Sequence, residues 1–166
     1  ATDLWLSPSE WHRKRLSHLH PSPWEIVPDG CDLEPFDALA AAGFAKVPGR
    51  VIWTSSPDRG LHWLVQEWPI IRQAVPHATL RVFYPIQGWL DRMAAVTDGP
   101  PDILEQKARA EFISRRRPVL EKMGVEFRGG ASRVEITREI AAAECFAYTC
   151  DPTIPTEGYS VSTCES

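Results

Sequence analysis

Two glutamates near the end of the chain, Glu157 and Glu165, lie eight positions apart and enclose a glycine and several small hydroxyl residues. A loop rich in proline and threonine precedes Glu157, whereas the residues from Ser160 onward favour the start of a helix. One carboxylate would then lie at the end of the loop and the other about a turn and a half into the helix. Free backbone N–H groups at a helix N-terminus bind anions. Carboxylates on both sides of such amides suit a ligand that combines sugar hydroxyls, a pyrophosphate and a ribose.

The composition is that of an ordinary globular protein. The chain has 166 residues, of which 43% are hydrophobic and 24% charged, enough for one compact domain and few for two. A net charge of −4 provides no general attraction to nucleic acid or to an anionic membrane. No apolar run approaches the roughly 20 residues that span a bilayer. These features predict a cytoplasmic protein without a nucleic-acid partner.

The cysteines and histidines suggest no metal site. The chain contains four cysteines, Cys31, Cys145, Cys150 and Cys164, which show neither C-x-x-C spacing nor a nearby histidine pattern for zinc. A reducing compartment therefore fits best. None of the five histidines has a sequence partner that indicates a nucleophilic triad or a metal ligand set.

Strand-like and helix-like segments alternate along the chain. The clearest buried strand covers 50–54, a polar loop follows over 55–60, and apolar residues recur at helical spacing over 61–75. A strand over 78–84 completes a β-α-β unit, which implies a parallel pair joined by a right-handed crossover.

The same alternation continues toward the end of the chain. Helices are expected over 102–123 and from Ser132, a capping residue, to about 143, with strands over 124–128 and 145–148. The sequence therefore predicts an α/β protein with a doubly wound parallel sheet.

The first third of the chain is less regular. Short strands are expected over 4–6 and 24–28, and Ser7 is expected to cap a helix that has Pro8 at its first position. Residues 47–49, which contain a proline and a glycine, are expected to form a connector.

Two loops occupy positions suited to a ligand. In open parallel sheets, ligands bind outside the carboxyl ends of the strands. The loops 55–60 and 150–158 each follow a predicted strand and lead directly into a helix N-terminus. We expect them to converge on one anionic ligand.

With this order established, the chain resembles the retaining glycosyltransferases of the GT-B fold, in the large group 1 or family 4 class. Five segments carry the resemblance, and they occur in the order and at the intervals typical of the family. They are Trp5–Trp11 (WLSPSEW), which resembles the last strand and helix of the acceptor-side domain, Ile26–Asp32 (IVPDGCD), Ser55–Leu61 (SSPDRGL), Val125–Gly129 (VEFRG) and Glu157–Glu165 (EGYSVSTCE). The last resembles the family motif E-G-F-G-x-x-x-x-E almost residue for residue.

The resemblance implies roles for particular residues. Glu157 would hold sugar hydroxyls near the reacting carbon, and Arg59 stands where the family has a lysine that neutralises the leaving diphosphate. These two are the expected catalytic residues, without a metal and without a cofactor other than a UDP- or GDP-type sugar donor as substrate. Arginine preserves the charge of that lysine but not its geometry.

The same resemblance implies a set of donor-binding residues. Glu165 would accept the ribose hydroxyls, and backbone amides around Ser160 would hold the diphosphate, although the family has glycine at that position. The expected donor-binding residues are Ser55, Ser56, Gly158, Tyr159, Ser160, Val161 and Glu165. Arg128 and Arg133 are candidates to border the base or phosphate pocket.

The resemblance also implies how the chain is organised. Residues 1–22 would be a remnant of the acceptor-side domain and the crossing helix, and 23–166 would be a donor-binding domain truncated at its C-terminal end. The acceptor, which the sequence does not identify as glycan, lipid or protein, would need the missing acceptor domain. We expect the fragment to be inactive alone.

Two alternatives stay open. One is a GT-B relative with other chemistry, such as a sugar-nucleotide epimerase or a phosphorylase. The other is a non-enzymatic binding module that uses the basic clusters Arg13–Arg15 and Arg115–Arg117. The first cluster also leaves open a peripheral contact with a membrane surface.

Overall fold

A parallel four-stranded sheet forms the centre of the protein, for which the computed structural model describes residues 4–19, 21–27, 30 and 32–149. Its strands lie in the spatial order β5-β4-β3-β6. They are β3 (Val47–Trp53), β4 (Thr79–Val82), β5 (Val125–Phe127) and β6 (Ala143–Phe146).

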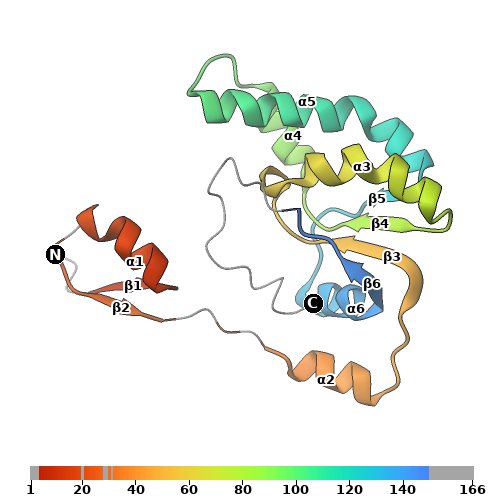
Figure 1. Cartoon of the computed structure of the whole chain (residues 1–166), viewed down its shortest axis with the longest axis horizontal. Helices are drawn as coiled ribbons and strands as arrows, with labels where there is room; N and C mark the ends of the chain where they lie inside the picture. The colour runs from red at the N-terminus through yellow and green to blue at the C-terminus, as the bar shows by residue number, and fades with distance from the viewer. Residues whose placement is uncertain (1–3, 20, 28–29, 31, 150–166) are drawn as a thin grey trace.

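Helices cover both faces of this sheet (Figure 1). One face carries α3 (Leu61–Ala74), α4 (Ile86–Ala94) and α5 (Pro101–Lys122). The other face carries α6 (Arg133–Ala142), against which α2 (Glu34–Ala41) packs. The prediction of a doubly wound α/β fold is confirmed.

The strand order determines where a ligand can bind. If β3, β4, β5 and β6 are numbered one to four along the chain, their spatial order is 3-2-1-4. This order matches the first four strands of a Rossmann-like sheet. From β3 the chain adds β4 on one side, and it returns later to add β6 on the other side. The topological switch point therefore lies between β3 and β6.

The core is divided between the two faces of the sheet because neighbouring strand residues point in opposite directions. Trp53 belongs to the larger cluster beneath α3 and α5, together with the fully buried Trp68. The indole N–H of Trp68 donates a 3.0 Å hydrogen bond to the carbonyl oxygen of Met123, the residue that ends α5. Ile52 faces the other way and packs with Ile140 of α6.

Residues 47–49 are part of β3, so the expected connector is wrong. The register between β3 and β6 shifts between Val47 and Val51, as at a β-bulge, and Gly49 adopts a left-handed φ of 73° there. The Gly49 N–H donates to the Glu144 carboxylate at 2.6 Å instead of to a strand carbonyl. A bulge uses the same residue types as a turn, which is why the local sequence was misleading.

The helix-capping predictions had different outcomes. Ser132 caps α6 as expected, because its hydroxyl accepts a hydrogen bond from the N–H of Glu135 at 3.2 Å. The cap of α1 (Glu10–Leu16) is Ser9 and not Ser7, since Ser9 accepts the N–H of His12 at 3.3 Å. Ser7 is instead the last residue of a strand, and its carbonyl oxygen accepts the N–H of Val27.

The segment before the central sheet forms its own strand pair. β1 (Trp5–Ser7) and β2 (Trp24–Ile26) are parallel, and α1 and a short 3₁₀ helix (Ser17–Leu19) connect them. Trp5 and Trp24 stack with their ring centroids 5.4 Å apart. This pair spans the boundary expected between residues 22 and 23. In the described part of the chain, none of the helices is both long enough and apolar enough to cross a membrane.

Candidate functional site

The carboxyl ends of β3 and β6 lie next to each other at the switch point of the sheet (Figure 1). Ile52 is paired with Phe146, and the N–H of Ala147 continues the ladder with a 2.9 Å hydrogen bond to the Ile52 carbonyl oxygen. Beyond this point the ring of Tyr148 stacks on Trp53, with the two planes 20° apart. The chain that leaves β6 is therefore held against the end of β3.

The loop after β3 is anchored by the core. The indole N–H of Trp53 donates a 2.7 Å hydrogen bond to the carbonyl oxygen of Ser55, whose side chain is buried. A single 3₁₀ turn over Pro57–Arg59 follows, closed by a 3.1 Å hydrogen bond from the N–H of Arg59 to the Ser56 carbonyl oxygen. A hydrogen bond between the side chains of Ser56 and Asp58 supports the same turn. The loop is thus a short, hydrogen-bonded structure.

Gly60 joins this loop to α3 and brings it against the chain beyond β6. Its φ of 105° lies in the left-handed region, which favours glycine. A Cβ at this position would lie 2.0 Å from the carbonyl oxygen of Thr149. The Thr149 hydroxyl donates a 2.6 Å hydrogen bond to the Gly60 carbonyl oxygen. The loop 55–60 therefore contacts the last described residue after β6, whereas the expected loop 150–158 lies outside the described residues.

The first turn of α3 places a helix N-terminus beside the contact between Gly60 and Thr149. The Gly60 carbonyl oxygen accepts the N–H of Trp63 at 3.0 Å and of Leu64 at 3.4 Å, so the helix begins directly after the loop. A helix N-terminus carries a partial positive charge, whereas Asp58 and Arg59 in the preceding turn carry opposite charges. The N–H groups of the first helical turn can bind a phosphate or a carboxylate.

The predicted site residues fall into two groups. Ser55, Ser56 and Arg59 lie in the one turn described above. The motif near the end of the chain lies outside the described residues, so the roles expected for Glu157, Gly158, Tyr159, Ser160, Val161 and Glu165 stay predictions.

A cavity at the carboxyl edge was not predicted. It has a volume of about 400 Å³ and lies where β4 and β5 end, beside the first turn of α4. Arg128 lines it, whereas the role expected for Arg128 at a base or phosphate pocket stays a prediction. Arg133 does not line this cavity, since it lines a separate groove between α2 and α6. The other lining residues are Pro85, Ile86, Gln87, Gly88, Arg117, Phe127 and Gly129.

Arg117 is the residue of this cavity that sequence reasoning missed. Its guanidinium lies 5.1 Å from the centre of the Phe127 ring and donates to the Gln87 side-chain oxygen at 3.1 Å. In the sequence it belongs to a run of three arginines that resembles a solvated helix face. Only the docking of α5 beside β5 shows that Arg117 borders a cavity.

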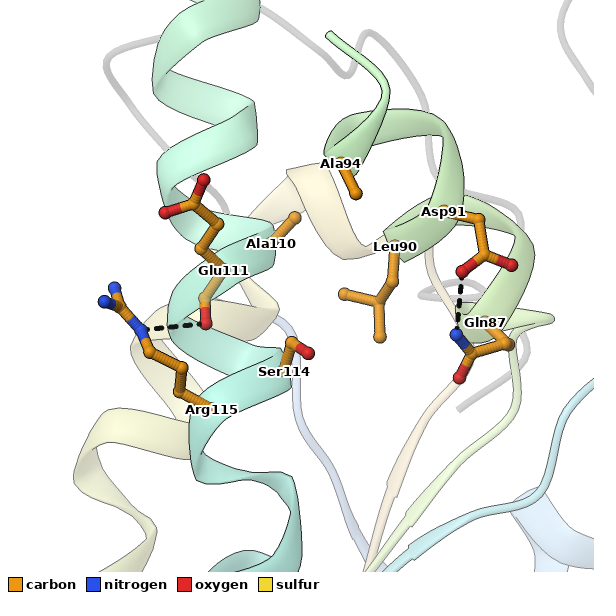
Figure 2. Close-up of a pocket in the computed structure, with 8 residues that line it drawn as sticks. All are labelled: Gln87, Leu90, Asp91, Ala94, Ala110, Glu111, Ser114 and Arg115. Carbon is orange, nitrogen blue, oxygen red and sulfur yellow. Dashed lines mark hydrogen bonds between the residues drawn. The ribbon is translucent and has the colours of Figure 1, made fainter.

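Another cavity, of about 300 Å³, lies between α4 and α5 (Figure 2). Leu90 lies between the two helices, whereas the side chains of Glu111 and Arg115 point away from α4. The side-chain amide of Gln87 donates to Asp91 on its own helix at 2.9 Å. Because Gln87 and Asp91 bond to each other, and Glu111 and Arg115 point away from α4, we assign no ligand to this cavity.

The described residues contain no group of three or more histidines, cysteines or acidic residues placed to hold a metal ion. Compared with models of protein families, with curated proteins and with solved structures, the chain gives no match.

Proposed function

We propose that this chain supplies the donor-binding half of a retaining glycosyltransferase, which transfers a sugar from a UDP- or GDP-type donor to an acceptor. One observation carries the proposal. The loop with Ser55, Ser56 and Arg59 meets the chain beyond β6 at the switch point, through the 2.6 Å hydrogen bond between Thr149 and Gly60. That is where nucleotides bind in sheets of this topology.

In this proposal the two ends of the nucleotide bind at two different points of the carboxyl edge. The diphosphate would lie at the loop after β3 and the N-terminus of α3, next to Arg59. The nucleoside would extend toward the cavity beyond β4 and β5, where Phe127 offers an aromatic ring, and Arg117 and Arg128 offer planar guanidinium groups. Such groups favour a flat, polar base.

The chemistry would depend on Arg59. When the bond between the sugar and the diphosphate breaks, negative charge develops on the leaving diphosphate. A guanidinium held beside it stabilises that charge more in the transition state than in the ground state. In this proposal Glu157 holds the sugar hydroxyls and Glu165 holds the ribose. A hydroxyl of the acceptor attacks the sugar from the face that the diphosphate leaves, which retains the configuration, and its proton passes to the departing diphosphate. The acceptor is a glycan, a lipid or a protein.

Calorimetric titration with a panel of nucleoside diphosphates tests the proposal. We expect binding of UDP or GDP without sugar transfer by this chain alone. Arg59→Ala should weaken that binding about ten-fold or more, since a charge-assisted hydrogen bond contributes about 1.5–3 kcal/mol. Arg138→Ala, which removes an exposed arginine of α6, is the matched control and should leave affinity unchanged. Absence of binding to every nucleotide would refute the proposal.

Glu165→Ala separates the ribose role from the rest of the site. We expect it to weaken nucleotide affinity, whereas unchanged affinity would remove Glu165 from donor binding and leave the role of Arg59 intact. Donor hydrolysis or epimerisation by a longer form of the protein would favour the epimerase or phosphorylase alternative.

The binding-module alternative has less support from the geometry. Glu10 pairs with Arg13 on α1, and Arg117 donates to Glu121 at 2.8 Å, so both basic clusters contain residues engaged with neighbouring acids. Binding to liposomes or nucleic acid that falls steeply with salt, without nucleotide binding, would support that alternative.

A further inference from the structure

A groove between α3 and α5 combines an exposed tryptophan with an ion pair between a buried arginine and a half-exposed glutamate. It has a volume of about 280 Å³. The first two turns of α3 contribute His62, Trp63 and Gln66, and α5 contributes Glu105, Arg109 and Phe112. His62 and Trp63 lie in the first turn of α3, next to the proposed donor site, but no side chain of this groove is assigned a role in that site.

Trp63 provides an apolar platform in this groove. Its side chain is 44% exposed, whereas Trp68 on the same helix is fully buried. The ring of His62 lies against the indole, with the two centroids 4.7 Å apart, and His62 itself is buried. The indole therefore has a packed neighbour on one side and lines an open groove. A large aromatic surface in such a place is suited to a ligand that covers it.

The polar side of the groove is charge-balanced. Arg109 is only 7% exposed, and its guanidinium donates to the carboxylate of Glu105, which is half exposed. The amide of Gln66, one turn from Trp63, adds a donor and an acceptor at the rim. A ligand placed on the indole would therefore find hydrogen-bonding groups of both kinds but no net charge from the Arg109–Glu105 pair.

We propose that this groove binds a pyranose ring of a neutral glycan, stacked on Trp63. One face of a pyranose presents C–H groups that pack on an indole, and its hydroxyls both donate and accept hydrogen bonds. A fully apolar ligand would desolvate the Arg109–Glu105 pair without replacing its bonds to water. A strongly anionic ligand would place its charge beside the Glu105 carboxylate. The volume suits a single sugar ring, because larger ligands occupy pockets of roughly 300–1,000 Å³.

The test measures the binding of simple neutral sugars by saturation-transfer NMR. The panel contains methyl glycosides of glucose, galactose, mannose and N-acetylglucosamine, and we expect at least one to bind with a Kd of about 0.1–10 mM. Trp63→Ala should weaken that binding more than ten-fold, and Glu105→Gln several-fold. Trp11→Ala is the matched control, since Trp11 is also an exposed tryptophan (53%) but lies on α1, and it should change nothing. Circular dichroism of each variant verifies that it is folded.

Two further measurements separate this site from the donor site. Sugar binding should persist in Arg59→Ala and in the presence of saturating UDP or GDP. Displacement by the nucleotide would place the sugar in the donor site and overturn the inference. It would also be overturned if no glycoside binds, if Trp63→Ala binds as well as the unmodified protein, or if glucose 6-phosphate binds more tightly than glucose. Because the readout needs no nucleotide, failure of the donor proposal would leave this inference standing.

Discussion

Replacing Gly60 by alanine tests whether the contact between Gly60 and Thr149 stabilises the protein and its proposed ligand site. An L-residue in the left-handed region costs about 1–2 kcal/mol, and φ at Gly60 is 105°. The new Cβ would also lie 2.0 Å from the Thr149 carbonyl oxygen, a backbone atom that cannot rotate away. Gly60 and Thr149 would have to move apart, which would lose the 2.6 Å hydrogen bond from Thr149, worth about 0.5–1.5 kcal/mol. We therefore expect Gly60→Ala to lower the free energy of unfolding by about 2–3 kcal/mol.

Gly43→Ala is the matched control for this experiment. Gly43 also has a positive φ, of 70°, but apart from its chain neighbours no atom lies within 4 Å of the position that a Cβ would take. Its substitution should therefore carry only the backbone cost, about 1–2 kcal/mol. Urea unfolding followed by circular dichroism measures the free energy of unfolding of both variants. The two values can be compared if the variants have equal m-values.

The two variants should also differ in ligand binding. Gly60→Ala should reduce nucleotide affinity along with stability, whereas Gly43→Ala, at the end of α2, should reduce stability alone. If the two substitutions lower the free energy of unfolding equally, the contact between Gly60 and Thr149 contributes nothing to stability, and our reasoning about this contact is wrong.

Two further predictions concern charged groups. Glu139→Gln should lower the free energy of unfolding by about 1–3 kcal/mol, because the Glu139 carboxylate receives hydrogen bonds of 2.7 and 2.8 Å from Arg81 and is only 16% exposed. The control Glu126→Gln removes a 39% exposed partner of the same arginine and should cost less than about 1 kcal/mol in the same urea assay; equal costs would contradict the burial argument. Hydrogen bonding from Arg13 holds the pKa of Glu10 below its usual value, so its contribution to stability is present above the unfolded pKa and is lost as the pH falls through the lowered folded pKa. NMR titration of the Glu10 carboxyl should show this lowered pKa, and Arg13→Gln should return it to the usual range.

The sequence by itself determined the elements of this fold. The apolar strand of β3, the helical period of α3 and the cap at Ser132 depend on residues that lie close together in the chain, and local geometry alone relates them to structure. The alternation of strands and helices was therefore sufficient to predict a doubly wound parallel sheet. It was also sufficient to select the loop over 55–60 as a candidate ligand site. A loop that directly follows a strand in the sequence lies at the carboxyl end of that strand.

Local pattern was less reliable where one residue type serves two structures. Gly49 marks a bulge inside β3 and not a connector, since its partner is Glu144, which is 95 positions away in the sequence. Ser7 and Ser9 are both competent helix caps. Because β1 pairs with β2, the carbonyl oxygen of Ser7 is hydrogen-bonded within the strand pair, and Ser9 caps the helix instead.

Only the tertiary structure decided which loops and side chains meet. The order β5-β4-β3-β6 depends on packing between segments that are nearly 100 residues apart, and it places Thr149 against Gly60. The docking of α5 makes Arg117 line a cavity and buries Arg109 beside the exposed Trp63. Chain-local periodicity indicates which face of a helix is apolar, but it contains no information about which other helix covers that face. The motif between Glu157 and Glu165 rests on sequence alone, whereas the loop that contains Arg59 is held in place by hydrogen bonds with Trp53 and Thr149.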